Sequence, residues 1–218
     1  MKQEAPTLTK ASILLMQTAL AILMLILTAC STFKSKTLPP IDTSLAPKYN
    51  WQQIRPSLEE IKHWQTIGKI NIRTPEDSVT VAINNWTQTQ QSFSIDLSST
   101  FFGLGATKLF GNEQFLTILK SDDKPLSSNQ PNLLVSQTLG FPLPISYLPF
   151  WIKALPMPEH FFNIQFYQNG LPKSLFQDSW KLEFSKYMFK NGLPFPGKIK
   201  LQHKDTRIIL VIKKWTLL

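Results

Sequence analysis

Apolar and polar residues alternate with a period of two through much of the chain after Gly68. The alternation recurs in short runs bounded by polar residues, at 70–72, 79–83, 93–97, 162–166, 180–184 and 199–201. Such runs are typical of strands that bury one face, and Asn169-Gly170 and Asn191-Gly192 are typical dipeptides of tight turns. The pattern therefore predicts an antiparallel meander. Residues 207–215 are apolar almost throughout, and we expect a last strand that is buried on both faces.

Residues 48–64 repeat their apolar side chains at a helical spacing instead. The repeating residues are Trp51, Ile54, Leu58 and Ile61. Pro56 falls inside this run, and residues 57–60 after it fit a capping box, in which a serine and a glutamate satisfy free backbone amides. We therefore expect Pro56 to interrupt the helix and a second turn to begin after it.

Residues 126–155 also break the β pattern. Ser146 is a candidate cap for a helix whose first turn contains Pro149, a position where proline is tolerated. The apolar stripe of that helix consists of Leu148, Trp151, Ile152 and Leu155. The helix either packs on the sheet as an ordinary core element or forms a lid over an apolar cavity, and composition alone does not decide between the two.

The first thirty residues have a pattern of their own. Lys2 and Lys10 accompany an apolar run that ends in Leu27-Thr28-Ala29-Cys30. A secretory signal ends in small residues before its cleavage site, and this run is short for a transmembrane helix of about 20 residues. The segment resembles the lipobox of bacterial lipoproteins, which implies cleavage before Cys30, a diacylglycerol on its sulfur and an acyl chain on the new amine. The alternative is a transmembrane helix with an incidental cysteine.

This segment sets the expected domain organisation. Residues 1–29 would be a lipoprotein signal peptide, 30–47 a lipidated N-terminus with a flexible tether rich in Ser, Thr, Lys and Pro, and 48–218 a single domain. Among lipoproteins an Asp after the cysteine often means retention in the inner membrane. Ser31 therefore favours the outer membrane, where acyl chains on Cys30 would hold the domain at the periplasmic face.

Composition and charge narrow the function further. The chain has 218 residues, 43% of them hydrophobic, which is enough for one domain with a real core. Its formal net charge is +9, which indicates either a solvated basic surface or attraction to anionic lipid head groups or an acidic partner. No basic helix or aromatic-basic motif supports nucleic-acid binding.

The sequence gives no sign of an enzyme. The three histidines, at 63, 160 and 203, are scattered, and neither a Gly-x-Ser-x-Gly motif nor a cluster with metal-ligand spacing is present. Gly103-x-Gly105 is too short to bind phosphate, and a lipidated Cys30 is no thiol nucleophile. We expect no catalytic residue, no metal and no cofactor other than the covalent lipid on Cys30. A structural or assembly lipoprotein, or another lipid-binding barrel, stays open as an alternative.

Several apolar motifs occur in an order that resembles the LolB family of outer-membrane lipoprotein receptors, over roughly residues 48–216. The motifs are Gly140-Phe141-Pro142-Leu143-Pro144, Leu148, Trp151-Ile152, Leu155-Pro156, the strand around Trp86, Ser179-Trp180-Lys181 and the last strand ending at Trp215. The resemblance implies a mostly β fold with α-helices. In it an incomplete, half-open antiparallel β-barrel carries a helical lid over an apolar cavity.

The family resemblance also implies a function. Its members accept lipoproteins from the periplasmic carrier LolA, hold the acyl chains of this cargo in the cavity and insert it into the inner leaflet of the outer membrane, in contact with phospholipid. We expect a monomer. The candidate cavity residues are Trp86, Trp151, Trp180, Trp215, Leu148 and Ile152. For each tryptophan, ordinary core packing is the alternative.

The segment 99–105 is the sharpest functional candidate. It follows a predicted strand and carries Phe101, Phe102 and Leu104, and exposed apolar clusters usually contact a membrane or a partner. By the resemblance, Leu104 corresponds to a leucine that helps to push cargo into the bilayer. Gly103 stands where the family often has proline, and the two phenylalanines are a local departure. The alternative is a buried turn.

Overall fold

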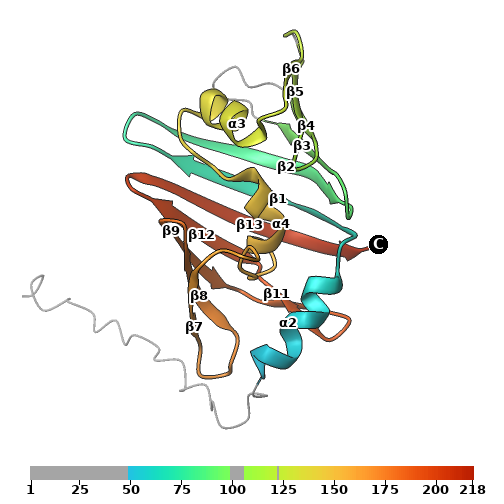
Figure 1. The fold of residues 1–218 in the computed structure, drawn as a ribbon, viewed down its shortest axis with the longest axis vertical. Coiled ribbons are helices and arrows are strands. Elements are labelled where there is room, and N and C mark those ends of the chain that lie inside the picture. The colour runs from blue at the N-terminus through green and yellow to red at the C-terminus, as the bar shows by residue number, and fades with distance from the viewer. Residues whose placement is uncertain (1–48, 99–105, 122) are drawn as a thin grey trace, which may run out of the picture. The chain divides into compact units, whose positions relative to one another are not determined.

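The computed structural model describes residues 49–98, 106–121 and 123–218 (Figure 1). Eleven strands form one sheet: β1 Trp64–Arg73, β2 Ser78–Gln88, β3 Phe93–Ser98, β4 Ala106–Gly111, β5 Leu116–Lys120, β6 Leu126–Ser128, β7 Phe162–Phe166, β8 Pro172–Gln177, β9 Trp180–Ser185, β12 Lys198–His203 and β13 Thr206–Leu217. A separate hairpin consists of β10 Met188–Lys190 and β11 Leu193–Phe195. The helices are α2 Trp51–Glu60, α3 Pro131–Leu139 and α4 Leu148–Trp151, and the 3-10 turn η2 Ile145–Tyr147 directly precedes α4. Within the described residues, no helix is long and apolar enough to cross a membrane.

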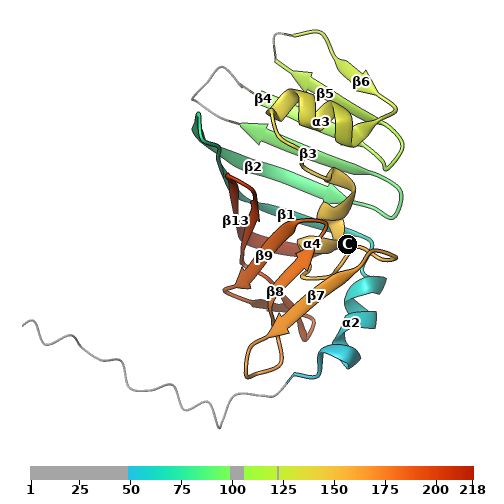
Figure 2. The same ribbon diagram turned by 60° about the vertical axis from the view of Figure 1, so that its left-hand side comes forward.

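The sheet is antiparallel throughout and is not closed. Its strand order is β6-β5-β4-β3-β2-β1-β13-β12-β9-β8-β7, so that β1 pairs with the last strand of the chain. Strands β6 and β7 are the two edges. Figure 2 shows α3 and α4 on one side of this sheet. The expected incomplete antiparallel barrel with a helical lid is therefore confirmed.

Alternating side chains give the sheet two different faces. The inner face carries the buried or half-buried side chains of Ile70 and Ile72 on β1 and of Ile208 and Leu210 on β13. The outer face carries their neighbours, which are more exposed. The prediction that the last strand is buried on both faces was wrong: β13 alternates, because lysine and arginine occupy several of its outer positions.

Gly68 allows β1 and β13 to pair closely. The register between these two strands shifts between Ile67 and Gly68, which is the mark of a β-bulge. A Cβ atom at Gly68 would overlap the carbonyl oxygen of Val211. A residue with a side chain would therefore force the two central strands of the sheet apart.

Helix α2 runs through Pro56 without a break, so the expected interruption there was wrong. The side chain of Asn50 caps its first turn by accepting a hydrogen bond from the amide of Gln52, at 3.1 Å. Pro56 cannot donate to the carbonyl of Gln52 four residues earlier. Both residues are exposed, so this carbonyl can hydrogen-bond to water, and the buried Leu58 keeps the helix on the core.

Candidate functional site

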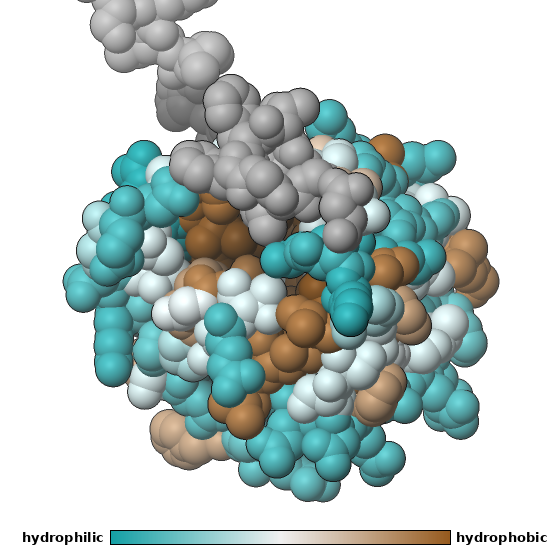
Figure 3. Space-filling model, turned by 90° about the horizontal axis from the view of Figure 1, so that it is seen from above, coloured by the Kyte–Doolittle hydropathy of each residue, from teal (hydrophilic) through white to brown (hydrophobic). Residues whose placement is uncertain are grey.

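An apolar cavity of about 390 Å³ lies between the inner face of the sheet and the segment 131–148. This volume falls within the range of about 300–1,000 Å³ that is usual for small-molecule sites. Seen from one end of the molecule, hydrophobic side chains gather in a hollow framed by hydrophilic ones (Figure 3). We call residues 131–148 the lid, because α3 and the turn after it form the wall opposite the sheet.

Seven strands and the lid line this cavity, mostly with aliphatic side chains. The apolar lining from the strands is Ile70, Ile72, Val79, Val81, Ile83, Trp86, Ile95, Leu97, Leu109, Ile118, Leu201, Ile208 and Leu210. The apolar lining from the lid is Val135, Leu139, Phe141, Leu143, Ile145 and Leu148. Such a surface can hold an aliphatic chain by burial alone, at about 0.8 kcal/mol for each methylene.

Five polar residues also line the cavity. Thr74 and Asp77 lie in the turn between β1 and β2, and Lys120 is the last residue of β5. The other two are Thr107 and Thr138. The Nζ atom of Lys120 lies 3.7 Å from a carboxylate oxygen of Asp123. The charged groups of the lining thus lie at strand ends, and the middle of the strands presents hydrocarbon.

Trp86 and Leu148, two of the six predicted cavity residues, line the cavity. Trp86 is 5% exposed, and its ring centroid lies 5.2 Å from that of Trp64. Its indole N–H is buried and has no hydrogen-bond partner among the described residues. A buried donor without a partner costs about 1–3 kcal/mol, so a polar atom of a ligand or a water molecule beside Trp86 would be stabilising.

The structure places Trp151, Ile152, Trp180 and Trp215 in the core outside the cavity lining. The ring of Trp151 packs on that of Trp180, with centroids 5.9 Å apart. Trp215 packs between Trp64 and Phe195, at centroid distances of 5.2 and 4.8 Å. These large rings fill the space between the sheet and its neighbouring elements. Ring contacts from Trp215 through Trp64 to Trp86 connect Trp215 with the cavity lining.

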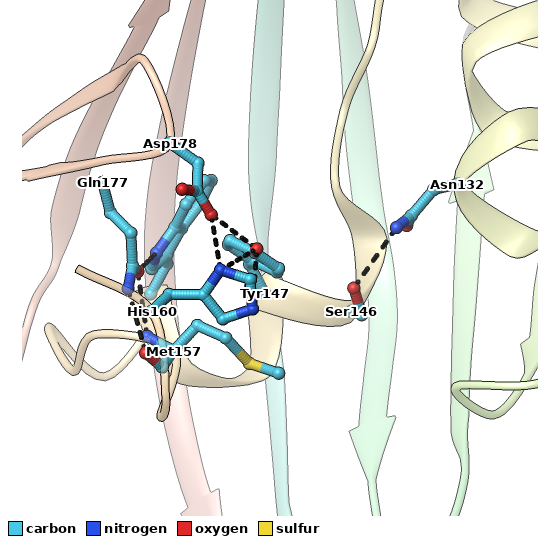
Figure 4. Close-up of polar contacts among 8 residues, drawn as sticks. Asn132, Ser146, Tyr147, Met157, His160, Gln177 and Asp178 are labelled. Atoms are coloured by element: carbon cyan, nitrogen blue, oxygen red, sulfur yellow. Dashed lines mark hydrogen bonds and ion pairs between the residues drawn. The ribbon is translucent and has the colours of Figure 1, made fainter. Parts of the chain in front are cut away.

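Two polar clusters lie where the lid and helix α4 meet the end of β8 and the turn after it (Figure 4). The Tyr147 hydroxyl donates to a carboxylate oxygen of Asp178 at 2.6 Å and lies 2.9 Å from Nδ1 of His160. Burial raises the pKa of Tyr147 to about 12, and the hydrogen bond to Asp178 acts in the same direction. Tyr147 is therefore protonated and can donate at neutral pH.

The second cluster is buried. Gln177, fully buried, accepts hydrogen bonds from the indole N–H of Trp151 and the amide of Met157, both at 2.9 Å. Its own amide donates to the carbonyl of Met157 at 2.9 Å. Helix α4 is thus fixed to the sheet. The hydrogen bonding between α3 and η2 is less extensive: the amide of Ile145 donates to the side chain of Asn132 at 3.0 Å.

Lys153 is a buried cation just after α4. It is 4% exposed, and its ammonium group donates to the carbonyl oxygens of Leu58 and Ile61, both at 2.8 Å. These carbonyls belong to the C-terminal end of α2, where a positive charge is favourable. Burial lowers the pKa of Lys153 to about 8, and the charge of Lys62 acts in the same direction. This contact joins α2 to the segment that follows the lid.

The remaining predicted site residues, Cys30, Phe101, Phe102 and Leu104, lie outside the described residues. Among the described residues, no group of three or more His, Cys, Asp or Glu side chains could hold a metal ion. The sequence reasoning did not single out the aliphatic lining of the strands. The period-two pattern carried that signal, because its inward positions are the residues that line the cavity.

The sequence of this chain is similar to one family along most of its length. The sequence model of the family described as outer membrane lipoprotein LolB matches residues 62–215. The outer-membrane lipoprotein LolB of Marinobacter nauticus is 32% identical over 197 residues, covering 89% of this chain and 94% of the relative. The LolB protein of Stutzerimonas stutzeri is 34% identical over 165 residues, covering 76% and 79%.

Solved structures show the same fold at low sequence identity. A LolA superfamily protein from Nitrosomonas europaea matches with a TM-score of 0.51 at 10% identity, over 78% of this chain and 94% of that one. A DUF1329 family protein from Desulfovibrio piger matches with a TM-score of 0.51 at 7% identity, over 74% and 88%. At these identities the likeness concerns the fold alone.

Proposed function

The chain belongs to the LolB family of outer-membrane lipoproteins, and on that basis we propose that it accepts lipoproteins from the periplasmic carrier LolA and inserts them into the inner leaflet of the outer membrane. This family serves lipoprotein localisation and is not a family of enzymes. In the proposed chain organisation, residues 1–29 are removed, Cys30 carries the lipid anchor, 30–47 form the tether and 48–218 bind the cargo.

The aliphatic cavity under the lid is the observation that carries this proposal. A structural lipoprotein does not need a cavity of about 390 Å³ lined by seven strands and a lid. We propose that the acyl chains of the cargo lie along the inner face of the sheet. The ester and peptide groups at the head of the lipid would then lie at the polar end of the cavity, beside Thr74, Asp77 and Lys120. Burying such groups costs less free energy beside polar side chains than beside hydrocarbon.

Transfer needs no chemical step and no nucleotide in this scheme. A tenfold preference for receptor over carrier needs only about 1.4 kcal/mol, which is less than the burial of two methylenes at about 0.8 kcal/mol each. A second step of similar size, from receptor to bilayer, would complete the transfer. A sequence of small affinity differences therefore suffices to move cargo in one direction.

We propose that Leu104, with Phe101 and Phe102, acts in the second step. Apolar side chains at the tip of a segment can enter the edge of a bilayer and lower the cost of moving an acyl chain across the interface. A glutamate at position 104 would instead keep a charge at that interface. It should impair delivery to the membrane without changing the cavity.

A two-step transfer assay tests this proposal. LolA loaded with a labelled lipoprotein is mixed with wild type or Leu104→Glu, and liposomes are added afterwards. We expect both proteins to take cargo from LolA and only wild type to deliver it at full rate. The matched control is Leu119→Glu, an exposed leucine on β5, which should behave like wild type. If wild type takes no cargo from LolA, the proposed receptor function is wrong and a structural lipoprotein is the better account.

A further inference from the structure

The outer face of the four strands β1, β13, β12 and β9 is strongly basic. Among the cations on it are Lys69 and Arg73 on β1, Arg207 on β13, Lys198 and Lys200 on β12, and Lys181 on β9. Lys198 is half-buried and the other five are exposed. We call these six residues the basic face. It lies on the side of the sheet opposite the cavity.

The strand register places these cations close together. Arg73 is directly opposite Arg207, and Val211 lies between Lys69 on one neighbouring strand and Lys198 on the other. Like charges directly opposite each other destabilise a sheet. Folding alone therefore does not account for this arrangement, and the attraction of each cation to an anionic partner would offset the repulsion between the cations.

Among the residues that the structure describes, few acidic groups neutralise the basic face. Glu183 is the acidic residue on the outer face of these four strands, and its carboxylate lies 3.1 Å from Lys181 and 3.3 Å from Lys200. Among the described residues, the other four cations of the basic face take part in no ion pair. They are available to a negatively charged surface.

We propose that the basic face docks on the anionic phospholipid head groups of the membrane in which the chain is anchored. The inference rests on the proposed lipid anchor at Cys30. The proposed tether of residues 31–47, if flexible, would span roughly 20–25 Å on average and would keep the bilayer within reach of the domain. Half-buried Ile209 and Val211 lie among the cations, and the stems of lysine and arginine can lie along such apolar surface while their charges reach head groups.

Docking would orient the domain. With the basic face on the bilayer, the inner face of the sheet and the lid turn away from the membrane (Figure 2). The lid is then presented to a carrier that arrives from the periplasm. Each cation near an anionic bilayer strengthens docking about fivefold, so removal of three should weaken it about a hundredfold.

Energy transfer in the lipidated full chain tests this orientation. The chain has one cysteine, which the lipid would occupy, so a new cysteine can be labelled alone. A fluorophore at Gln202→Cys reports on the outer face, because Gln202 is exposed and pairs with Arg207 and Lys181. A fluorophore at the exposed Gln137→Cys on α3 reports on the lid. Vesicles of phosphatidylcholine, with or without phosphatidylglycerol, carry a head-group acceptor dye.

We expect phosphatidylglycerol to increase energy transfer from position 202 and not from 137, and high salt to reverse the increase. The triple variant Lys69→Gln/Arg73→Gln/Arg207→Gln should abolish it. The matched control, Lys62→Gln/Lys124→Gln/Lys190→Gln, removes three exposed cations elsewhere and should preserve it. Equal energy transfer with and without phosphatidylglycerol would overturn the proposal. A fluorescence change at position 202 that an acidic carrier protein causes, and phosphatidylglycerol does not, would overturn it as well. Flotation with the vesicles shows whether the lipid anchor binds the membrane, and the LolA assay shows whether cargo is transferred. A loss of anchoring or of cargo transfer is therefore distinguished from a loss of docking.

Discussion

Filling the cavity from the sheet side should weaken acyl binding without unfolding the protein. Val79 is half-buried on the inner face of β2 and lines the cavity. A phenylalanine there would project into the space that an acyl chain would occupy. The neighbouring Thr80 points to the outer face, is exposed and has nearly the same size and shape as valine. Thr80→Phe is therefore a matched control on the same strand.

The magnitude follows from the volume that is lost. Phenylalanine adds about four carbon atoms to valine and would displace about as many methylenes of the bound chain, at about 0.8 kcal/mol each. The loss of binding free energy is about 3 kcal/mol, which corresponds to about a hundredfold rise in Kd. Overpacking should lower the free energy of unfolding of the empty protein by about 1–3 kcal/mol at most, because the ring enters existing space.

A fluorescent fatty acid, titrated into each variant, measures this effect. We expect Val79→Phe to raise the Kd about a hundredfold and Thr80→Phe to leave it within about twofold. Chemical denaturation should show that both variants are folded. An unchanged Kd in Val79→Phe, or the same rise in both variants, would refute the reasoning that acyl chains bind under the lid.

Two further predictions concern the segment that follows the lid. Because the folded pKa of Lys153 is about 8 and its ordinary value is 10.5, the unfolded chain holds more protons between these values, and the free energy of unfolding should rise with pH there. Urea titrations across this window should show the rise in wild type and its loss in Lys153→Met; the same slope in both would contradict the assignment. Gln177→Leu leaves the indole of Trp151 and the backbone of Met157 without their buried partner and should lower the free energy of unfolding by about 3 kcal/mol or more. Chemical denaturation measures it, and a loss below about 1 kcal/mol would contradict the role of Gln177.

The strands were predictable where apolar inner positions alternate with polar outer ones, as at Val79 and Val81. Strands β8 and β4 were missed, and their inner positions are not all apolar. On β8 the buried residues are Pro172, Leu175 and Gln177, and on β4 the inner face includes Thr107. Burial in these strands depends on hydrogen bonds and turns that a hydrophobic pattern does not record. Helix α2 shows the same limit, since an exposed proline did not end it.

The candidate site was predictable in part for a related reason. Helical spacing placed Leu148 and Trp151 on one apolar stripe, but only Leu148 lines the cavity. Trp151 turns to Gln177 and Trp180 instead. An apolar helical stripe indicates that its residues are buried. Whether such a residue faces the cavity or the core depends on long-range contacts, which for Trp151 are those with β8 and β9. The aliphatic residues of the inner face are recognised as a cavity lining only once the strands pair and the lid lies opposite them.

Photocrosslinking of the cargo in transit tests the central claim most directly. A lipoprotein whose acyl chains end in a photoreactive group is loaded on LolA, mixed with the protein and irradiated, and mass spectrometry locates the attachment sites. The account predicts attachment to inner-face residues from different strands, such as Ile83, Ile118 and Leu210. Attachment confined to the outer face of the sheet, or none after complete mixing with loaded LolA, would contradict it.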